Sequence, residues 1–272
     1  MRSKKRSCQG SRARLRSWTL FWEQSQQQRA VRGRVVWLSA ACLHGTFIAG
    51  LLSAKRSSPA PAICPDCTLL IRPIFAETTS ESSQIPSATP QELAEAIFDC
   101  VKWGVQIINL SAALVQPSRT GERELGEAIT YAADRGVMIV AAGGNQGVIG
   151  STVITRHPWV IPVAACDLRG KPLDYSNLGN SISRHGLSAP GEDITSLGAN
   201  GRLSTFSGTS AAAPFVTGAI ALLWSEFPGA KSAEVKHAVT QSSVQRRATV
   251  VPPLLDAWEA HEVLKSKFRR RM

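Results

Sequence analysis

Three mainly apolar runs in the middle of the chain have the length of buried strands. They cover residues 105–110, 137–142 and 159–164. Strands with one face in water alternate apolar and polar residues, whereas these runs are largely unbroken Val, Ile, Leu and Ala. Each run is therefore predicted to be a strand that is buried on both faces of a sheet.

Helical patterns alternate with these runs. A helix is predicted over residues 89–104, because Thr89, Pro90 and Glu92 give an N-cap, a first-position proline and a capping-box acid. A second helix is predicted over residues 122–135. The apolar stripes of the two helices are Leu93, Ile97 and Val101, and Leu125, Ile129 and Ala132. Buried strands that alternate with such helices indicate an α/β fold with a mostly parallel sheet and helices on both faces.

A third helix is predicted from about Ser210 to Phe227, and it is apolar on almost every side. A helix of this kind is buried. Pro214 is tolerated because it lies in the first turn, where amide groups have no intrahelical acceptor. Ser210 then lies at the N-terminus of a buried helix, where free amides and the helix dipole stabilise developing negative charge.

The sequence around Ser210 resembles a known nucleophile segment. A serine before a helix is commonly only a cap. Residues 207–218 read SGTSAAAPFVTG, however, and this is similar to the nucleophile segment of the subtilisin-like serine proteases, the subtilases. Two more segments resemble that family in the expected order: HGT at 44–46 and GGN at 143–145. The resemblance implies that Ser210 is the nucleophile, His44 the general base, and Asn145 an oxyanion donor together with the Ser210 amide.

The resemblance covers about residues 38–265 and implies the three-layer subtilisin-like fold of a serine endopeptidase. Residues 107–111, IINLS, are similar to the strand that pairs with the bound peptide, so Ser111 and Ala112, with Gly143 and Gly144, are implied as substrate-binding residues. The usual Gly-Gly after this strand is absent, so the specificity pocket is expected to differ. The segment IRPIF at 71–75 suggests the subgroup of proteases that mature ribosomally made peptides.

One family element is missing from the sequence. The family order is Asp, His, Ser, but residues 1–43 contain no Asp, and Glu23 is their only acid. The strand that carries the Asp is therefore expected to be absent, and loss of the acid costs on the order of 10⁴ in rate. Three explanations stay open: a truncated or misassigned N-terminus, a pseudoprotease that binds peptides without turnover, or an acid supplied by Glu23 or a partner chain.

The charge of the chain is concentrated at its start. The net charge is +11, and residues 1–37 hold ten Lys or Arg against Glu23. Because no nucleic-acid-binding motif accompanies this basic stretch, we expect no nucleic-acid partner. The predicted organisation is a disordered basic leader at 1–34, a peptidase domain at 35–265 that lacks its first strand, and a basic tail at 266–272.

The remaining features point to no membrane, metal or cofactor. Residues 35–52 are 18 uncharged positions, the lower limit for a transmembrane helix, but polar residues and glycines lower their hydrophobicity. Cys64 and Cys67 have the spacing of a redox pair or half a zinc site, and no second pair accompanies them. We therefore predict reduced thiols, a cytoplasmic location, no membrane partner and a peptide or protein substrate.

Overall fold

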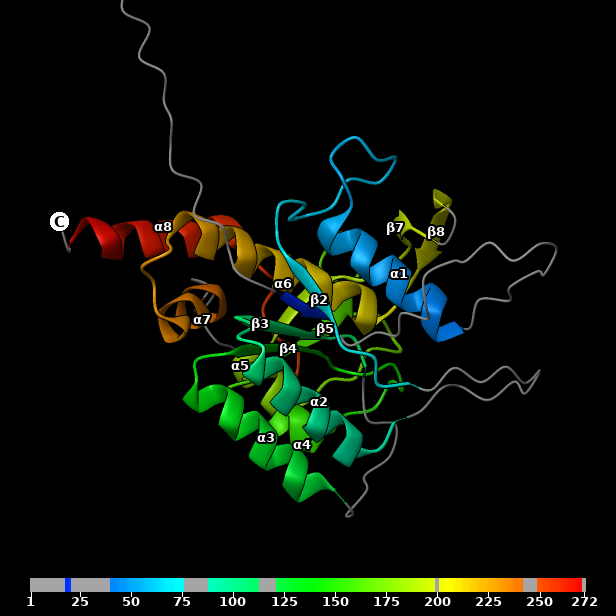
Figure 1. Cartoon of the computed structure of the whole chain (residues 1–272), viewed down its shortest axis with the longest axis horizontal. Coiled ribbons are helices and arrows are strands. Elements are labelled where there is room, and N and C mark those ends of the chain that lie inside the picture. The colour runs from blue at the N-terminus through cyan, green and yellow to red at the C-terminus, as the bar shows by residue number, and fades with distance from the viewer. Residues whose placement is uncertain are drawn as a thin grey trace, which may run out of the picture.

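The protein has three layers, with a parallel sheet between two layers of helices (Figure 1). The computed structural model describes residues 18–20, 40–75, 88–112, 121–198, 201–241 and 249–270. The strands of the sheet lie in the order β2-β1-β3-β4-β5-β6, and every neighbouring pair is parallel. Their bounds are β1 Trp18–Leu20, β2 Leu69–Ile71, β3 Ile107–Leu110, β4 Met138–Ala142, β5 Ile161–Cys166 and β6 Leu187–Pro190. Strands β7 (Ile194–Leu197) and β8 (Leu203–Phe206) form a separate antiparallel hairpin.

The observed helices confirm those predicted from the apolar periodicity of the sequence. Their bounds are α1 Ala40–Ser53, α2 Pro90–Lys102, α3 Glu122–Asp134, α4 Val153–Arg156, α5 Asn180–His185, α6 Thr209–Glu226, α7 Ser232–Thr240 and α8 Ala257–Arg269. The predicted helices correspond to α2, α3 and α6 within two residues at each end. Thr89 and Glu92 form the predicted reciprocal capping box at the start of α2. The α/β fold class predicted from the sequence is therefore confirmed.

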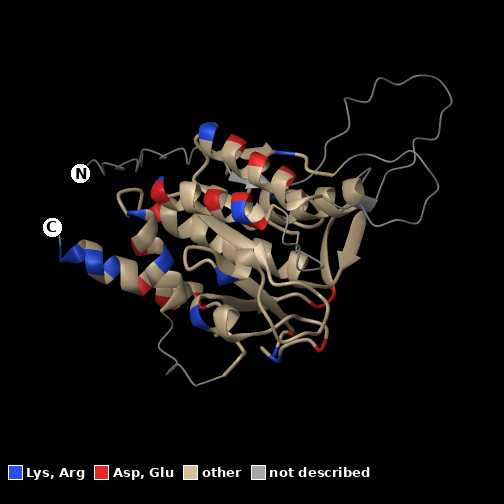
Figure 2. Cartoon of the chain, turned by 90° about the horizontal axis from the view of Figure 1, so that it is seen from below, with Lys and Arg blue, Asp and Glu red and all other residues tan. Residues whose placement is uncertain are grey.

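The structure can be compared with the predicted domain end at residue 265 and with the uncharged run at 35–52. Helix α8 continues to Arg269, so it passes the predicted domain end at residue 265 and includes the first part of the basic tail. Basic side chains gather at the C-terminal end of this helix (Figure 2). In the described part of the chain, no helix has both the length and the apolar character needed to cross a bilayer. Most of the uncharged run at 35–52 belongs to α1.

Strand β1 differs from the sequence-based prediction. Residues 18–20 were expected in a leader outside the fold, but they pair in parallel with β2 on one side and with β3 on the other. Strands β2 and β3 are joined only through β1, so these three residues close a gap that would leave two unpaired strand edges. The rest of the predicted leader, residues 1–17 and 21–34, lies outside the described residues.

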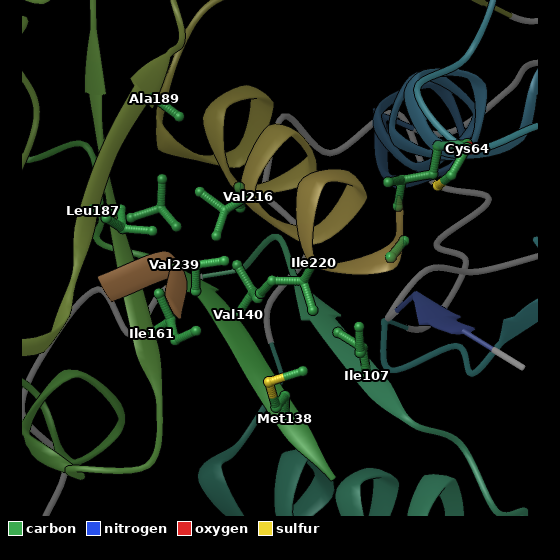
Figure 3. Packing of buried hydrophobic residues seen from close by; sticks show 14 of the residues in the cluster. Cys64, Ile107, Met138, Val140, Ile161, Leu187, Ala189, Val216, Ile220 and Val239 are labelled. Atoms are coloured by element: carbon green, nitrogen blue, oxygen red, sulfur yellow. The ribbon is translucent and has the colours of Figure 1, made fainter. Parts of the chain in front are cut away.

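Alternate residues of each strand pack on opposite faces of the sheet, so the core has two halves. One half contains Ile107, Met138 and Val140 of the sheet and is covered by α1, α6, α7 and α8. Figure 3 shows Ile220 of α6 lying over this face. The other half contains side chains of the same strands that face α2, α3 and α4. The sheet is thus buried on both faces, as its unbroken apolar strands predict.

Two helical glycines should respond oppositely to alanine. A Cβ at Gly218 of α6 would lie 2.5 Å from Cγ2 of Ile63, whereas a Cβ at Gly126 of α3 would meet nothing closer than 3.7 Å. We expect Gly218→Ala to destabilise the chain by about 1–3 kcal/mol through overpacking. Gly126→Ala should stabilise it by roughly 0.5–1 kcal/mol through helix propensity. Thermal or urea unfolding measures both, and a stabilised Gly218→Ala would contradict the tight packing of α6 against Ile63.

Candidate active site

Ser210 lies in the first turn of α6, directly after a tight turn that leaves β8. Gly208 is the N-cap and has φ 137°, a conformation that L side chains rarely adopt. A Cβ there would also lie 2.8 Å from Nδ2 of Asn145. The first amides of a helix have no intrahelical acceptor, so the Ser210 N–H is placed to stabilise negative charge. The turn therefore needs glycine both for its backbone and for the approach of Asn145.

Asn145 is held against the start of α6 by its side-chain oxygen. Its Oδ1 accepts hydrogen bonds from the Thr209 N–H at 2.9 Å and from the Thr209 hydroxyl at 3.0 Å, although Thr209 is 64 positions later in the sequence. Because Oδ1 is occupied, Nδ2 is the end of the amide that lies beside Gly208. The structure therefore brings Asn145 to the residue before Ser210 with donor hydrogens available.

The backbone amides of Gly143 and Gly144 form hydrogen bonds that hold the segment leading to Asn145. Both are buried, and the Gly144 N–H donates to the Thr209 hydroxyl at 3.1 Å. The Gly143 N–H donates to the Val163 carbonyl of β5 at 2.9 Å. These backbone groups are used inside the chain, where they position Asn145. A direct contact of either glycine with substrate stays a prediction.

Asn177 anchors the loop that carries Asn145, a role that the sequence reasoning missed. Its Oδ1 accepts from the backbone N–H groups of Gln146 and Val148, at 3.0 and 3.2 Å. Its Nδ2 donates to the Gly143 carbonyl at 3.2 Å. One side chain thus bonds to both sides of Asn145, and the SNLG segment at 176–179 was its only signal in the sequence.

Ser111 holds the backbone of the nucleophile. A helical carbonyl normally accepts from the N–H four residues later, but the residue four after Ser210 is Pro214, which has none. The Ser111 hydroxyl donates to the Ser210 carbonyl at 3.1 Å instead. Ser111 was predicted to bind substrate, and its hydroxyl serves the nucleophile segment. Ala112, predicted for the same role, is the last described residue before the gap at 113–120 and is partly buried.

Two further residues extend this contact into the core. The Asn109 amide donates to the Ser111 hydroxyl at 2.8 Å, and Asn109 Oδ1 accepts from the Thr217 hydroxyl of α6 at 2.7 Å. Asn109 and Thr217 are buried, at 1% and 0% exposure. The sequence reasoning did not single them out. A polar residue in an Ile/Leu strand and another on an apolar helix were the available signals.

His44 lies on α1, which packs against α6 and the β7–β8 hairpin. One turn later, Phe47 is fully buried, and its carbonyl accepts a hydrogen bond from Ser196 of β7 at 2.9 Å. The His44 ring stands edge-on to Phe206, with centroids 6.2 Å apart, and Phe206 is four residues before Ser210. Helix α1 and this hairpin thus bring His44 to the same end of the sheet as the nucleophile segment.

No hydrogen bond joins the His44 ring to the Ser210 hydroxyl in the described structure, although the family resemblance implies that His44 is the base for Ser210. Catalytic hydrogen bonds are often long before substrate binds. Burial lowers the pKa of His44, and no carboxylate in the described part of the chain acts against this effect. The imidazole is therefore held in its neutral form, which is the form of a general base.

The other predicted chemistry of the chain concerns its thiols and metals. No disulfide joins the five described cysteines, while Cys8 lies outside the described residues. Over the same residues, no group of three or more His, Cys, Asp or Glu side chains gathers in a way that could hold a metal ion. The site as described therefore consists of a serine, a histidine, an amide donor and their supports.

Known proteins resemble this chain in sequence and in fold. The Subtilase family model matches residues 39–258 of the chain. A thermostable alkaline protease of Halalkalibacterium halodurans is 29% identical over 74% of this chain and 52% of its own length. Mycosin-3 of Mycobacterium tuberculosis is 30% identical over 74% of this chain and 54% of its own length. The chain spans about half the length of these curated relatives.

Solved structures cover more of the chain. The prenylagaramide maturation protease PagA is 30% identical with a TM-score of 0.77, over 92% of this chain and 93% of its own. The patellamide maturation protease PatA is 29% identical with a TM-score of 0.75, over 93% of this chain and 97% of its own. Together with the family match across most of the sequence, these similarities show that the chain belongs to the subtilase family of serine proteases.

Proposed function

We propose that the chain is a serine endopeptidase in which Ser210 is the nucleophile and His44 the general base. The position of Asn145 carries this proposal, because its amide is fixed at the N-terminus of α6 beside Ser210. Ser210 Oγ attacks the peptide carbonyl while His44 takes its proton. The Asn145 Nδ2 group and the Ser210 N–H stabilise the oxyanion. His44 then gives the proton to the leaving amine, and water releases the acyl group by the same steps.

The substrate class is proposed from the structural neighbours. PatA and PagA are described as maturation proteases for patellamide and prenylagaramide, at 29% and 30% identity over nearly the whole chain. The PatG macrocyclase, at 26% identity and TM-score 0.68, has been solved in complex with a peptide. We infer that this chain cuts peptides of the same kind, ribosomally made precursors, in the cytoplasm. The thiols, with no disulfide in the described part, support that location.

A specific observation favours a second candidate, a peptide-binding pseudoprotease. The acid of a serine triad orients the histidine and stabilises its protonated form. Among the described residues, no carboxylate contributes to the pKa of His44. A chain that keeps the substrate-binding residues and lacks this acid would bind peptides without efficient turnover.

Labelling of Ser210 separates the two candidates. We expect a serine-directed peptide phosphonate to label the chain slowly and incompletely, because the general base lacks its orienting acid. Intact-mass spectrometry follows the reaction, and Ser210→Ala should abolish it. Labelling that is equal in both proteins would favour the pseudoprotease.

A rapid, stoichiometric reaction would instead show that some group already does the work of the acid. Glu23→Gln is the matched variant for this outcome, because Glu23 is the only acid among residues 1–43. Loss of rapid labelling in Glu23→Gln would identify that carboxylate as the acid.

Ser111→Ala should both destabilise the fold and slow the labelling of Ser210. Without the hydroxyl, the Ser210 carbonyl loses its donor at a position where Pro214 offers none, which costs about 1–3 kcal/mol. Part of that cost should appear as a roughly tenfold slower labelling rate, since 1.36 kcal/mol is a factor of ten.

Ser188→Ala is the matched control for this experiment. Its hydroxyl is also buried and donates to a backbone carbonyl, that of Pro252, at 3.1 Å. We expect a similar loss of melting temperature and an unchanged labelling rate. Equal rates in the two variants would show that Ser111 has only a structural role.

Supplying the acid should raise both activity and the pKa of His44. We propose a chimera in which residues 1–34 are replaced by an apolar strand that ends in Asp-Thr-Gly, with a linker to His44. Hydrolysis of a fluorogenic peptide should rise by up to about 10⁴, and Ser210→Ala should remove the gain.

The pH profile gives an independent reading. Burial lowers the pKa of His44 from 6.5, so the neutral base persists to lower pH and the acid limb of kcat/KM should lie below pH 6.5 in the original chain. A neighbouring carboxylate stabilises the imidazolium, so in the chimera this limb should move to higher pH. A folded, more stable chimera without any gain in hydrolysis would mean that the site is inactive.

A further inference from the structure

A pocket of about 780 Å³ is lined in part by the segment that follows Asn145, beginning at Ile149. It is bordered by residues 149–151, the C-terminal end of α4 and helix α5. The volume is in the range of small-molecule sites. Ser210, His44 and Asn145 are not among its lining residues, so the pocket is separate from the candidate active site. Ile149, Pro158 and Val250 give part of its wall an apolar character.

The polar part of the wall is cationic. Arg156, Arg184 and His185 line the pocket, and none of its described lining residues is Asp or Glu. Arg156 has a carboxylate only at the outer limit of an ion pair, with Nη2 4.0 Å from Glu122 Oε2. Arg184 forms no ion pair with any described carboxylate. Two guanidinium groups, each suited to bidentate binding of an oxyanion, are thus left with little compensation.

His185 faces the same excess of positive charge. Its Nε2 lies 3.0 Å from the Thr155 carbonyl and donates to it, so Nδ1 is left for another partner. Burial lowers the pKa of His185, and the charges of Lys236 and Arg184 lower it further. Lys236 donates to the carbonyl of Pro158, another residue of the wall, and burial lowers its pKa to about 8. A bound anion would favour the protonated forms of His185 and Lys236.

Ser181 is a second, independent sign of a missing partner. It lines the pocket, and its hydroxyl is shielded from solvent without a hydrogen-bond partner in the described structure. Buried hydroxyls are nearly always bonded, because an unmade hydrogen bond costs about 1–3 kcal/mol. Rotation of the Ser181 side chain about χ1 would bring this hydroxyl to an acceptor bound in the pocket.

We propose that this pocket binds a small organic anion, whose carboxylate or phosphate group is held by Arg156 and Arg184. The apolar part of the ligand lies against Ile149 and Val250. The Ser181 hydroxyl donates to the same group or to its linking oxygen. Binding requires no covalent step and is independent of peptide hydrolysis.

Calorimetric titration of the full chain tests the proposal. Phenyl phosphate and benzoate are the probes, and benzyl alcohol is the neutral counterpart with the same ring. We expect saturable binding of one molecule of at least one anion for each chain, at least tenfold tighter than benzyl alcohol. The better anion identifies phosphate or carboxylate as the preferred group.

Matched variants locate the site. Arg156→Gln with Arg184→Gln should weaken anion binding at least tenfold. Arg56→Gln with Arg169→Gln removes the same charge from two exposed arginines outside the pocket and should leave binding unchanged. Ser181→Ala changes no charge and should weaken binding several-fold. Melting temperatures of all variants confirm that they are folded.

The proposal is overturned by an absence of saturable binding to either anion. It is also overturned if both arginine pairs weaken binding equally, because the effect then follows net charge. Benzyl alcohol that binds as tightly as the anions would equally exclude it. None of these measurements depends on catalysis. A failure to bind anions can therefore be distinguished from a lack of activity at Ser210.

Discussion

The burial of helix α6 is the constraint on which the rest of this structure depends. The helix is apolar on nearly every face, so it is stable only where neighbours surround it. It packs on β3, β4, β5 and β6, and α1, α7 and α8 also contact it. A helix so enclosed has only its ends free to meet solvent or substrate. The first turn, with Ser210, therefore becomes the natural position for chemistry.

Burial of α6 also creates a polar problem that the fold solves locally. Pro214 removes the amide that would serve the Ser210 carbonyl, and Ser111 supplies a donor from the end of β3. Behind it, the buried Thr217 hydroxyl donates to Oδ1 of the buried Asn109. Buried polar groups add little net stability when they are paired and cost much when they are not. Such pairs therefore fix the position of α6 relative to the sheet rather than increase its stability greatly.

His44, the candidate base, lies at the edge of the sheet formed by the carboxyl ends of the strands. The carboxyl ends of parallel strands lie together, and ligands bind outside them in α/β folds. Leu20 of β1 is opposite Asn109, so the carboxyl end of β1 faces the same edge as Ser111 and the start of α6. His44 reaches that end from α1 through its contact with Phe206. Burial alone keeps its imidazole neutral, whereas an acid would also have to orient the ring and stabilise its charge during catalysis.

The sequence by itself determined the layered α/β fold, the main helices and the segments around His44, Asn145 and Ser210. Apolar periodicity, capping residues and short motifs are local properties, and they can be read without knowing what lies opposite. The partners of those segments were decided by tertiary structure. Thr209 orients Asn145, and Asn177 holds the loop that carries Asn145. The Ser111 hydroxyl, predicted to bind substrate, donates to the Ser210 carbonyl. Strand β1 was also missed, because three residues in a basic segment gain their strand character only from two neighbouring edges. Pairings between residues tens of positions apart depend on how layers pack, and no local pattern specifies them.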